Sequence, residues 1–136
     1  MQRSPGDQAR RDRLVDAASG VEPAGVVLYL NVHGLDHEEK SARQIAAHDH
    51  AAARDWVVAE WLIDNVDPAT HRNDRPGWQV AAQIIEDEGS DVRGIVVPSL
   101  DDVADTAEEQ AAARKWAVSH GGFLTAATMA GQGGAS

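Results

Sequence analysis

The sequence has 136 residues, a length that suits a single domain. Its 12 Lys and Arg residues are outnumbered by 22 Asp and Glu residues, and the formal net charge of -10 argues against direct binding to nucleic acid or to an anionic membrane surface. The chain has no Cys, which excludes disulfides, thiolate metal ligands and Cys nucleophiles. No apolar run approaches the roughly 18 residues of a membrane span, and the N-terminus lacks a secretory signal, so we expect a cytoplasmic protein with no membrane segment.

The two ends of the chain differ in composition from the middle. Residues 1–24 are polar, mixed in charge and interrupted by Pro5, Gly6, Gly20 and Pro23, which predicts a flexible N-terminal arm. Residues 127–136 are small and rich in Gly, which predicts a disordered tail. The folded domain is therefore expected to cover residues 25–126.

Within this domain, short apolar runs alternate with Ala-rich amphipathic segments. The β-branched runs predict buried parallel strands, and the amphipathic segments predict helices. Pro76 suits the first turn of a helix and Gly89 its end, while Ser99 or Asp101 suits the N-cap of the next helix. The predicted order is strand 26–32, helix 37–55, strand 56–63, loop 64–75, helix 76–89, strand 92–97, helix 101–119 and strand 123–125.

This alternation predicts an α/β fold. We expect three layers, α/β/α, around a mostly parallel sheet of four to five strands joined by right-handed crossovers. The first helix should face the sheet through a stripe of Ala42, Ile45, Ala46, Ala52 and Ala53.

Polar side chains stand at the predicted carboxyl ends of the strands, where sites of such folds lie: Asn31, His33, Asp64, Asp101 and Asp102. The segment NVHGLD that follows the first strand has one Gly and no Lys, so it is not a phosphate-binding loop. His33 and the three aspartates could hold a divalent cation, although capping of a helix explains Asp101 and Asp102 as well. Because no spacing fixes three ligands, we predict no metal site and no cofactor.

Several short motifs occur in an order that resembles the catalytic domain of serine recombinases, the resolvases and invertases. The family pattern runs Tyr-x-Arg-Val-Ser on the first strand, a Gln on the next helix, a strand ending in Asp, then Arg-Pro-Gly, Gly-x-Asp and Leu-Asp-Arg-Leu-x-Arg. The resemblance covers about residues 25–126 and implies a resolvase-like fold. The corresponding residues here are Tyr29 to His33, Gln44, Asp64, Arg75 to Trp78, Gly89 to Asp91, and Leu100 to Asp105.

The departures from this pattern concern the chemistry. The resemblance places His33 at the position of the serine nucleophile that attacks a DNA phosphate, and Asn31 at that of the first arginine. Asp102 and Asp105 stand where two phosphate-neutralising arginines are expected. At ~6 Å from a phosphate, in an effective dielectric of ~20, each carboxylate costs on the order of 2–3 kcal/mol. Of the family's main arginines only Arg75 remains.

We therefore expect no catalytic residue and regard the domain as an inactive relative of the recombinases. Arg75 is expected to be an ordinary loop arginine paired with Asp74 or Asp64. The degenerate family positions are Tyr29, Asn31, His33, Asp64, Arg75, Asp91, Asp101, Asp102 and Asp105.

The function that this pattern favours is a protein-interaction or regulatory module with a protein partner that the sequence does not identify. Two alternatives remain open: a DNA-associated accessory factor related to site-specific recombination, and a metal-dependent enzyme that uses the acidic strand ends. The sequence ends before the family's long dimer and DNA-contacting helix, so the usual dimer and the usual grip on DNA are not expected, although another homodimer is compatible with the sequence. Most of the four tryptophans are expected in the core: Trp56, Trp61, Trp78 and Trp116.

Overall fold

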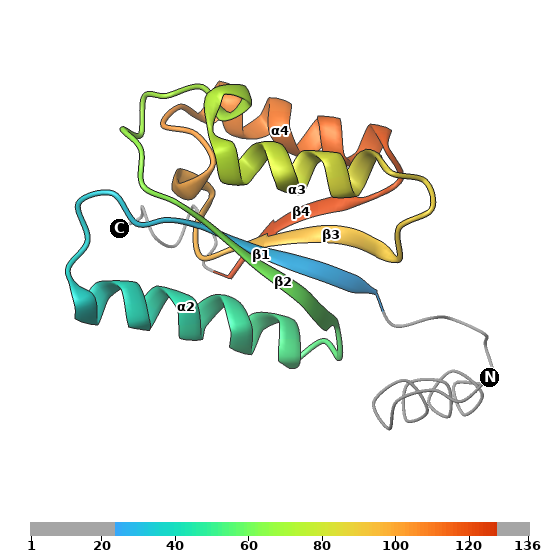
Figure 1. Ribbon diagram of the computed structural model, residues 1–136, viewed down its shortest axis with the longest axis horizontal. Helices are drawn as coiled ribbons and strands as arrows, with labels where there is room; N and C mark the ends of the chain where they lie inside the picture. The colour runs from blue at the N-terminus through green and yellow to red at the C-terminus, as the bar shows by residue number, and fades with distance from the viewer. Residues whose placement is uncertain (1–23, 128–136) are drawn as a thin grey trace.

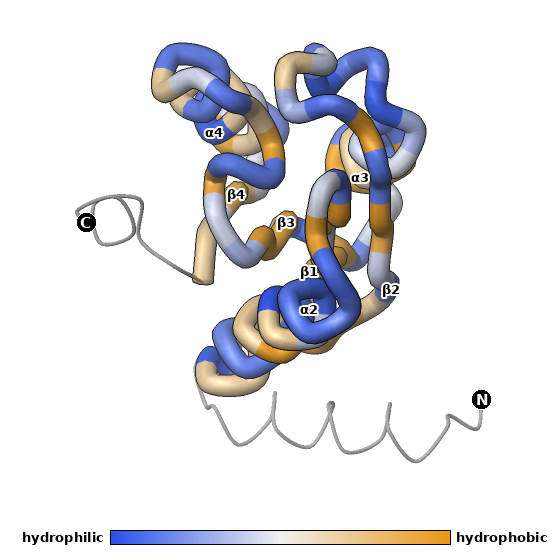
Figure 2. Tube along the Cα trace, turned by 90° about the vertical axis from the view of Figure 1, so that its left-hand side faces the viewer, coloured by the Kyte–Doolittle hydropathy of each residue, from blue (hydrophilic) through white to orange (hydrophobic). Residues whose placement is uncertain are grey.

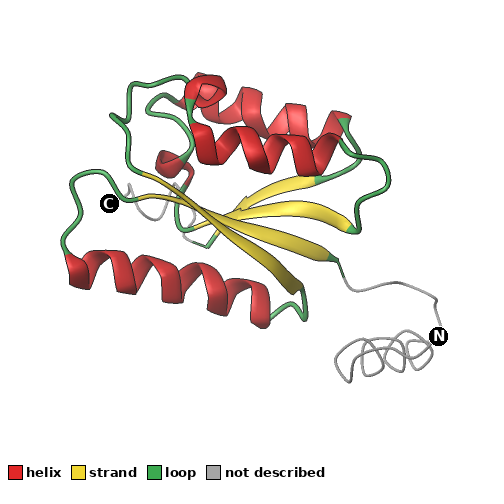
Figure 3. Ribbon diagram, in the orientation of Figure 1, coloured by secondary structure: helices red, strands yellow, loops and turns green. Residues whose placement is uncertain are grey.

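The computed structural model describes residues 24–127, and the predicted arm up to residue 23 and the predicted tail from residue 128 lie outside them. Strands and α-helices alternate along the described chain, as predicted (Figure 3). The elements are β1 (Gly25–Asn31), α2 (His37–Ala52), β2 (Val57–Asp64), the 3-10 helix η1 (Arg72–Asp74), α3 (Pro76–Glu86), β3 (Val92–Val97), the 3-10 helix η2 (Leu100–Asp102), α4 (Ala107–Ser119) and β4 (Phe123–Ala126).

The four strands form one sheet in the order β2-β1-β3-β4, and every neighbouring pair is parallel. Helix α2 covers one face of the sheet, while α3 and α4 lie side by side on the other face (Figures 1 and 2). The predicted three-layer α/β/α architecture is therefore confirmed. None of the helices in the described range is long and apolar enough to cross a membrane.

Each face of the sheet carries its own apolar core, because successive side chains of a strand point to opposite faces. Val27 and Tyr29 of β1 belong to the larger core with Trp78 of α3, whereas Val26 and Leu28 belong to the smaller core under α2. The prediction that the first strand is a buried parallel strand is therefore confirmed.

The predicted buried stripe of α2 is wrong. Ala47 and Ala51 are the residues that α2 buries, and Ile45 is 59% exposed. Ala occurs all round this helix and carries little hydrophobic signal, so the periodicity did not define the buried face. With only methyl groups at the contact, α2 can approach the sheet closely.

The last helix begins at Ala107, not at residue 101 as predicted. Ser99 caps the 3-10 helix η2 by accepting a hydrogen bond from the Asp101 backbone N–H, and Thr106 caps α4 by accepting one from Glu109. The segment between these caps turns inward, since the Asp102 side chain is completely buried. Two separate caps therefore replace the single helix start that the sequence predicted.

Gly94 of β3 provides a test of the packing between β3 and β4. A Cβ on Gly94 would overlap ring atoms of Phe123, so Gly94→Ala should force that ring aside and lower the free energy of unfolding by about 1–3 kcal/mol. Gly89→Ala is the matched control, because its Cβ would meet only Asp87 Oδ1 at 3.4 Å. Urea unfolding measures both, and equal midpoints for the two variants would contradict this packing.

Candidate functional site

Five of the predicted positions meet at the carboxyl ends of the strands: Tyr29, Asn31, Asp64, Arg75 and Asp102. All five are buried, and hydrogen bonds link them to one another and to the loops above the sheet. We call these five residues the strand-end network. Parallel strands place their carboxyl ends at one edge, which explains why residues so far apart in sequence meet.

Asp64, the last residue of β2, forms the N-terminal cap of α3 from outside the helix. Its Oδ1 accepts from the Gly77 backbone N–H at 2.7 Å, and its Oδ2 accepts from that of Trp78 at 3.1 Å. The residue in the local cap position, Arg75, makes no side-chain cap bond. The Asp64 carboxylate thus satisfies free N–H groups at the positive end of the helix dipole.

Gly77 is required by this arrangement. A Cβ at that position would lie 2.9 Å from Asp64 Oδ2, so any side chain would push the carboxylate away from the helix. Pro76 occupies the first turn, where a missing N–H costs nothing. The Pro-Gly pair of the motif therefore serves the contact between β2 and α3.

Tyr29 lies beside Asp64 and donates its hydroxyl proton to Oδ2 at 2.8 Å. Burial raises the pKa of the Tyr29 phenol; the hydrogen bond from Arg75 opposes that rise, while Asp64 adds to it. The phenol therefore stays protonated and acts as a hydrogen-bond donor to the carboxylate. Its ring packs edge-on against Trp78, with centroids 5.4 Å apart.

Arg75 is fully buried, and its guanidinium donates three hydrogen bonds to backbone carbonyls. Nε donates to Thr70 at 2.9 Å, Nη2 to Pro68 at 2.9 Å and Nη1 to Asp102 at 2.7 Å. Nη1 also points at the Tyr29 hydroxyl, 3.4 Å away. This side chain holds the loop after β2 against the turn after β3.

The predicted pairing of Arg75 with Asp74 or Asp64 is wrong. Its hydrogen bonds go to carbonyl oxygens and to a phenol, and it forms no ion pair with either carboxylate within the described residues. The physical reason is that the loop after β2 curls over the guanidinium and presents the carbonyls of Pro68 and Thr70 to it, while Asp102 presents a third.

Asn31 occupies the position where the resemblance expects an arginine, and its side chain closes the loop after β2. Its Nδ2 donates to the Val66 carbonyl at 3.0 Å, and its Oδ1 accepts from the Val66 N–H at 3.1 Å. The side-chain amide thus forms with the Val66 backbone the same two hydrogen bonds that a backbone amide group of a neighbouring strand would form. A side chain with both a donor and an acceptor is needed for this contact, which an arginine does not supply.

Asp102 is buried against the end of β1 and does not have the helix-capping role that the sequence suggested. Its Oδ2 accepts from the Asn31 backbone N–H at 3.1 Å, and its Oδ1 pairs with Arg43 Nη2. Burial raises the pKa of Asp102, while Arg43 and the Asn31 N–H act in the opposite direction. Arg43 reaches this carboxylate from α2 and keeps a third of its side chain exposed.

Sequence reasoning missed Arg43. It is one of several charged residues on α2, and nothing in its spacing indicates a partner that follows β3. The signal that could have found it is the buried Asp102, because a carboxylate without water requires a cation or several donors.

The side chains of the remaining predicted positions do not join the network, although the His33 backbone N–H donates to Asn31 Oδ1 at 3.4 Å. His33, Asp101 and Asp105 are exposed, and Asp101 accepts a hydrogen bond from Gln110 Nε2 at 3.0 Å. Asp91 precedes β3 and therefore lies at the amino edge of the sheet, opposite the network. The structure thus separates the degenerate positions into a buried cluster, three exposed side chains and one distant residue.

A cation site at the strand ends finds no geometric support. Among residues 24–127 there is no group of three or more His, Asp or Glu side chains that could hold a metal ion. Both oxygens of Asp64 and both oxygens of Asp102 already accept hydrogen bonds from the protein. These carboxylates therefore stabilise the fold through hydrogen bonds to the protein.

Arg43→Met should destabilise the protein in a pH-dependent way. The raised pKa of Asp102, above its ordinary 3.8, means that its contribution to stability is full at low pH and is lost as the pH rises through the folded-state pKa. Removing Arg43 raises that pKa further. We expect little loss near pH 4 and a loss of about 1–3 kcal/mol near pH 8, measured by urea unfolding. The control is Arg114→Met, at an exposed position, for which we expect no dependence of the loss on pH. If Arg43→Met lowered the free energy of unfolding equally at pH 4 and pH 8, that result would argue against this pair.

Arg75→Met should be more damaging at every pH. The variant removes three hydrogen bonds from a charged donor, one of them to the buried carbonyl of Asp102, which should lower the free energy of unfolding by about 3 kcal/mol or more. The measurement is again urea unfolding with Arg114→Met as control. Equal midpoints for the two variants would show that Arg75 does not hold the loops.

Comparison with known proteins supports the fold. No family model and no curated protein matches the sequence. The C-terminal catalytic domain of ISC1926 TnpA, an IS607-like serine recombinase, is similar with a TM-score of 0.65 and 17% identity, over 78% of this chain and 72% of that chain. The N-terminal catalytic domain of TP901-1 integrase is similar with a TM-score of 0.62 and 17% identity, over 76% of both chains. The chain therefore has the fold of a serine recombinase catalytic domain, as the motifs predicted.

Proposed function

We propose that this domain performs no phosphoryl transfer on DNA and acts by binding a protein partner. The observation that carries the proposal is the fate of Arg75, the one remaining arginine of the family pattern. Its side chain is fully buried and donates to three backbone carbonyls, so it is not accessible to a phosphate at the surface. The position of the nucleophile holds the exposed His33.

The charges around the strand ends also oppose a phosphate. Phosphoryl transfer requires cationic donors aimed at the developing charge. Arg43 and Arg72 are each paired with a carboxylate, and Arg75 is enclosed. The exposed charges that remain nearby include Asp36, Asp67, Asp101 and Asp105. A DNA phosphate approaching this edge would meet repulsion.

Binding to a protein fits the same features. The surface is acidic, and the edge strand β2 exposes Trp61 and Ile63, which are 37% and 47% accessible. Exposed aromatic and aliphatic side chains on an edge strand are common at protein interfaces.

A second candidate is an accessory factor that contacts an active recombinase. The observation that favours it is the similarity of the fold to two recombinase catalytic domains. Such a factor would act on DNA recombination through protein contacts, since its own charge opposes DNA.

The catalytic half of the proposal is tested by covalent trapping. The protein is incubated with supercoiled plasmid and with a library of random duplexes, and the reaction is stopped with detergent. We expect no protein–DNA adduct and no change in plasmid topology, for the wild type and for His33→Ser alike, because one hydroxyl does not restore the missing cations. An adduct formed by the wild type and lost in His33→Ala would refute the proposal.

The binding half is tested by capture from lysate of the source cells. We expect a protein retained in near-stoichiometric amount, and retained equally after nuclease treatment. Capture that nuclease abolishes would show that DNA, not a protein, is the partner.

A further inference from the structure

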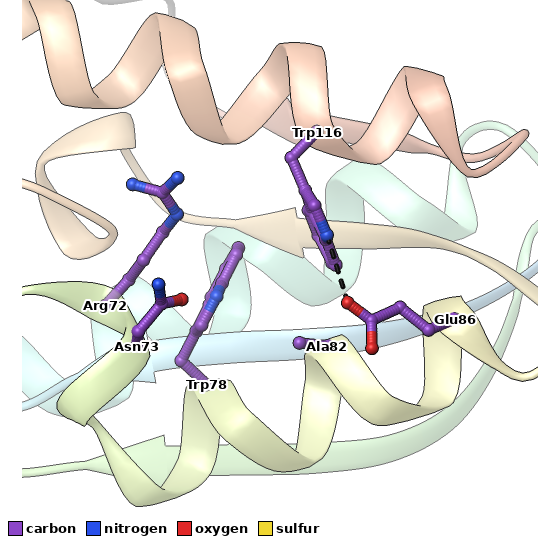
Figure 4. Close-up of a pocket in the computed structure, with 6 residues that line it drawn as sticks. All are labelled: Arg72, Asn73, Trp78, Ala82, Glu86 and Trp116. Carbon is purple, nitrogen blue, oxygen red and sulfur yellow. Dashed lines mark hydrogen bonds between the residues drawn. The ribbon is translucent and has the colours of Figure 1, made fainter.

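A pocket with a volume of about 260 Å³ lies between α3 and α4, on the face of the sheet opposite α2. Its lining residues come from η1, α3 and α4 and are drawn in Figure 4: Arg72, Asn73, Trp78, Ala82, Glu86 and Trp116. None of them belongs to the strand-end network. The volume is below the range of about 300–1,000 Å³ that is usual for drug-sized ligands, so the pocket suits a single side chain.

Trp116 and the Glu86 carboxylate form one end of this pocket, and Trp78 lies between them and the Arg72 end (Figure 4). The rings of Trp78 and Trp116 lie 5.8 Å apart at an angle of 52°. Trp116 Nε1 donates to Glu86 Oε2 at 3.2 Å, which fixes the carboxylate beside the indole (Figure 4). The other Glu86 oxygen has no hydrogen-bond partner among the described residues and is free to accept.

The charged lining residue at this end is Glu86, which forms no ion pair among the described residues. Arg72, at the opposite end, is paired with Glu109 at 2.8 Å, so its charge is neutralised within the protein. Glu86 therefore remains as the unpaired charge among the lining residues. Arg93, near the end of α3, is directed at the carbonyls of Asp87 and Ser90.

The helix dipoles add to the same field. Both α3 and α4 connect parallel strands and run opposite to them, so their C-terminal ends lie at the same edge of the sheet. Glu86 ends α3 and Trp116 lies in the last turn of α4, and neither last turn contains a basic residue. Because Arg93 already donates to the Asp87 carbonyl at the end of α3, the negative end of α4 and the Glu86 carboxylate are the two features that attract a cation here.

We propose that this pocket binds a Lys or Arg side chain of a protein partner. The cationic head would contact Glu86 and the face of Trp116, and the aliphatic stem would lie along Ala82. Asn73, at the far end, can bond to the partner's backbone. The inference rests on the proposed function and names the chemistry of the partner: a basic segment, which the net charge of -10 would attract at long range.

Short peptides test this inference directly. The probes are acetylated and amidated pentapeptides, Gly-Gly-X-Gly-Gly, in which X is Arg, Lys or the neutral analogue citrulline. Binding is followed by the NMR signal of the Trp116 indole N–H, one of four such signals in the chain. We expect saturable shifts of Trp116 with the Arg and Lys peptides and about tenfold weaker binding of citrulline.

Two variants that remove one negative charge provide the control. Glu86→Gln should weaken the Arg peptide about tenfold, whereas Glu60→Gln, at an exposed position on β2, should change its affinity less than twofold. Equal binding of citrulline, equal effects of the two variants, or no shift of Trp116 at millimolar peptide would each overturn the inference. The wild-type shift locates the site without any variant. A negative peptide experiment would not change the result of the capture experiment, in which a partner is retained after nuclease treatment. The pocket proposal and the proposed function can therefore fail separately.

Discussion

The arrangement of the polar edge depends on one carboxylate, that of Asp64. It joins three elements, because it ends β2, accepts the hydroxyl of Tyr29 from β1 and caps the first turn of α3. Once it is in place, Gly77 has no room for a side chain. The loop that leads into α3 then closes over Arg75. The Arg-Pro-Gly motif is therefore explained by the geometry of the fold, without any substrate.

The same reasoning applies to the other side of the network. Asn31 fastens the loop after β2, and Asp102 fastens the turn after β3 with the help of Arg43. In a parallel sheet this edge is where ligands usually bind. Here the carboxylates of Asp64 and Asp102 and the amide of Asn31 are paired within the protein, while Arg43 Nε is a buried donor without a partner among the described residues. The pocket between α3 and α4 differs in this respect, since Glu86 keeps a free acceptor.

The sequence predicted the order of strands and helices, since β-branched runs and Pro76 are strong local signals. It also predicted which strand ends meet, because that follows from the parallel topology. The sequence-based predictions were wrong where tertiary contacts determine the structure. The burial of Asp102 moved the start of α4 to Ala107, the Ala-rich surface of α2 concealed its buried face, and the carbonyls around Arg75 replaced the expected carboxylate partner. Arg43 differs from the other charged residues of α2 by its ion pair with Asp102, which only the three-dimensional structure reveals.

We infer that the strand-end network serves the fold and not a reaction. The most direct test is the free energy of unfolding of Asp64→Asn, with Asp105→Asn at an exposed position as the control. A residue kept for catalysis can often be replaced with no loss of stability, or with a gain. We predict that Asp64→Asn loses about 1–3 kcal/mol relative to the wild type, whereas the control is unchanged. An Asp64→Asn variant as stable as the wild type, or more stable, would contradict the account.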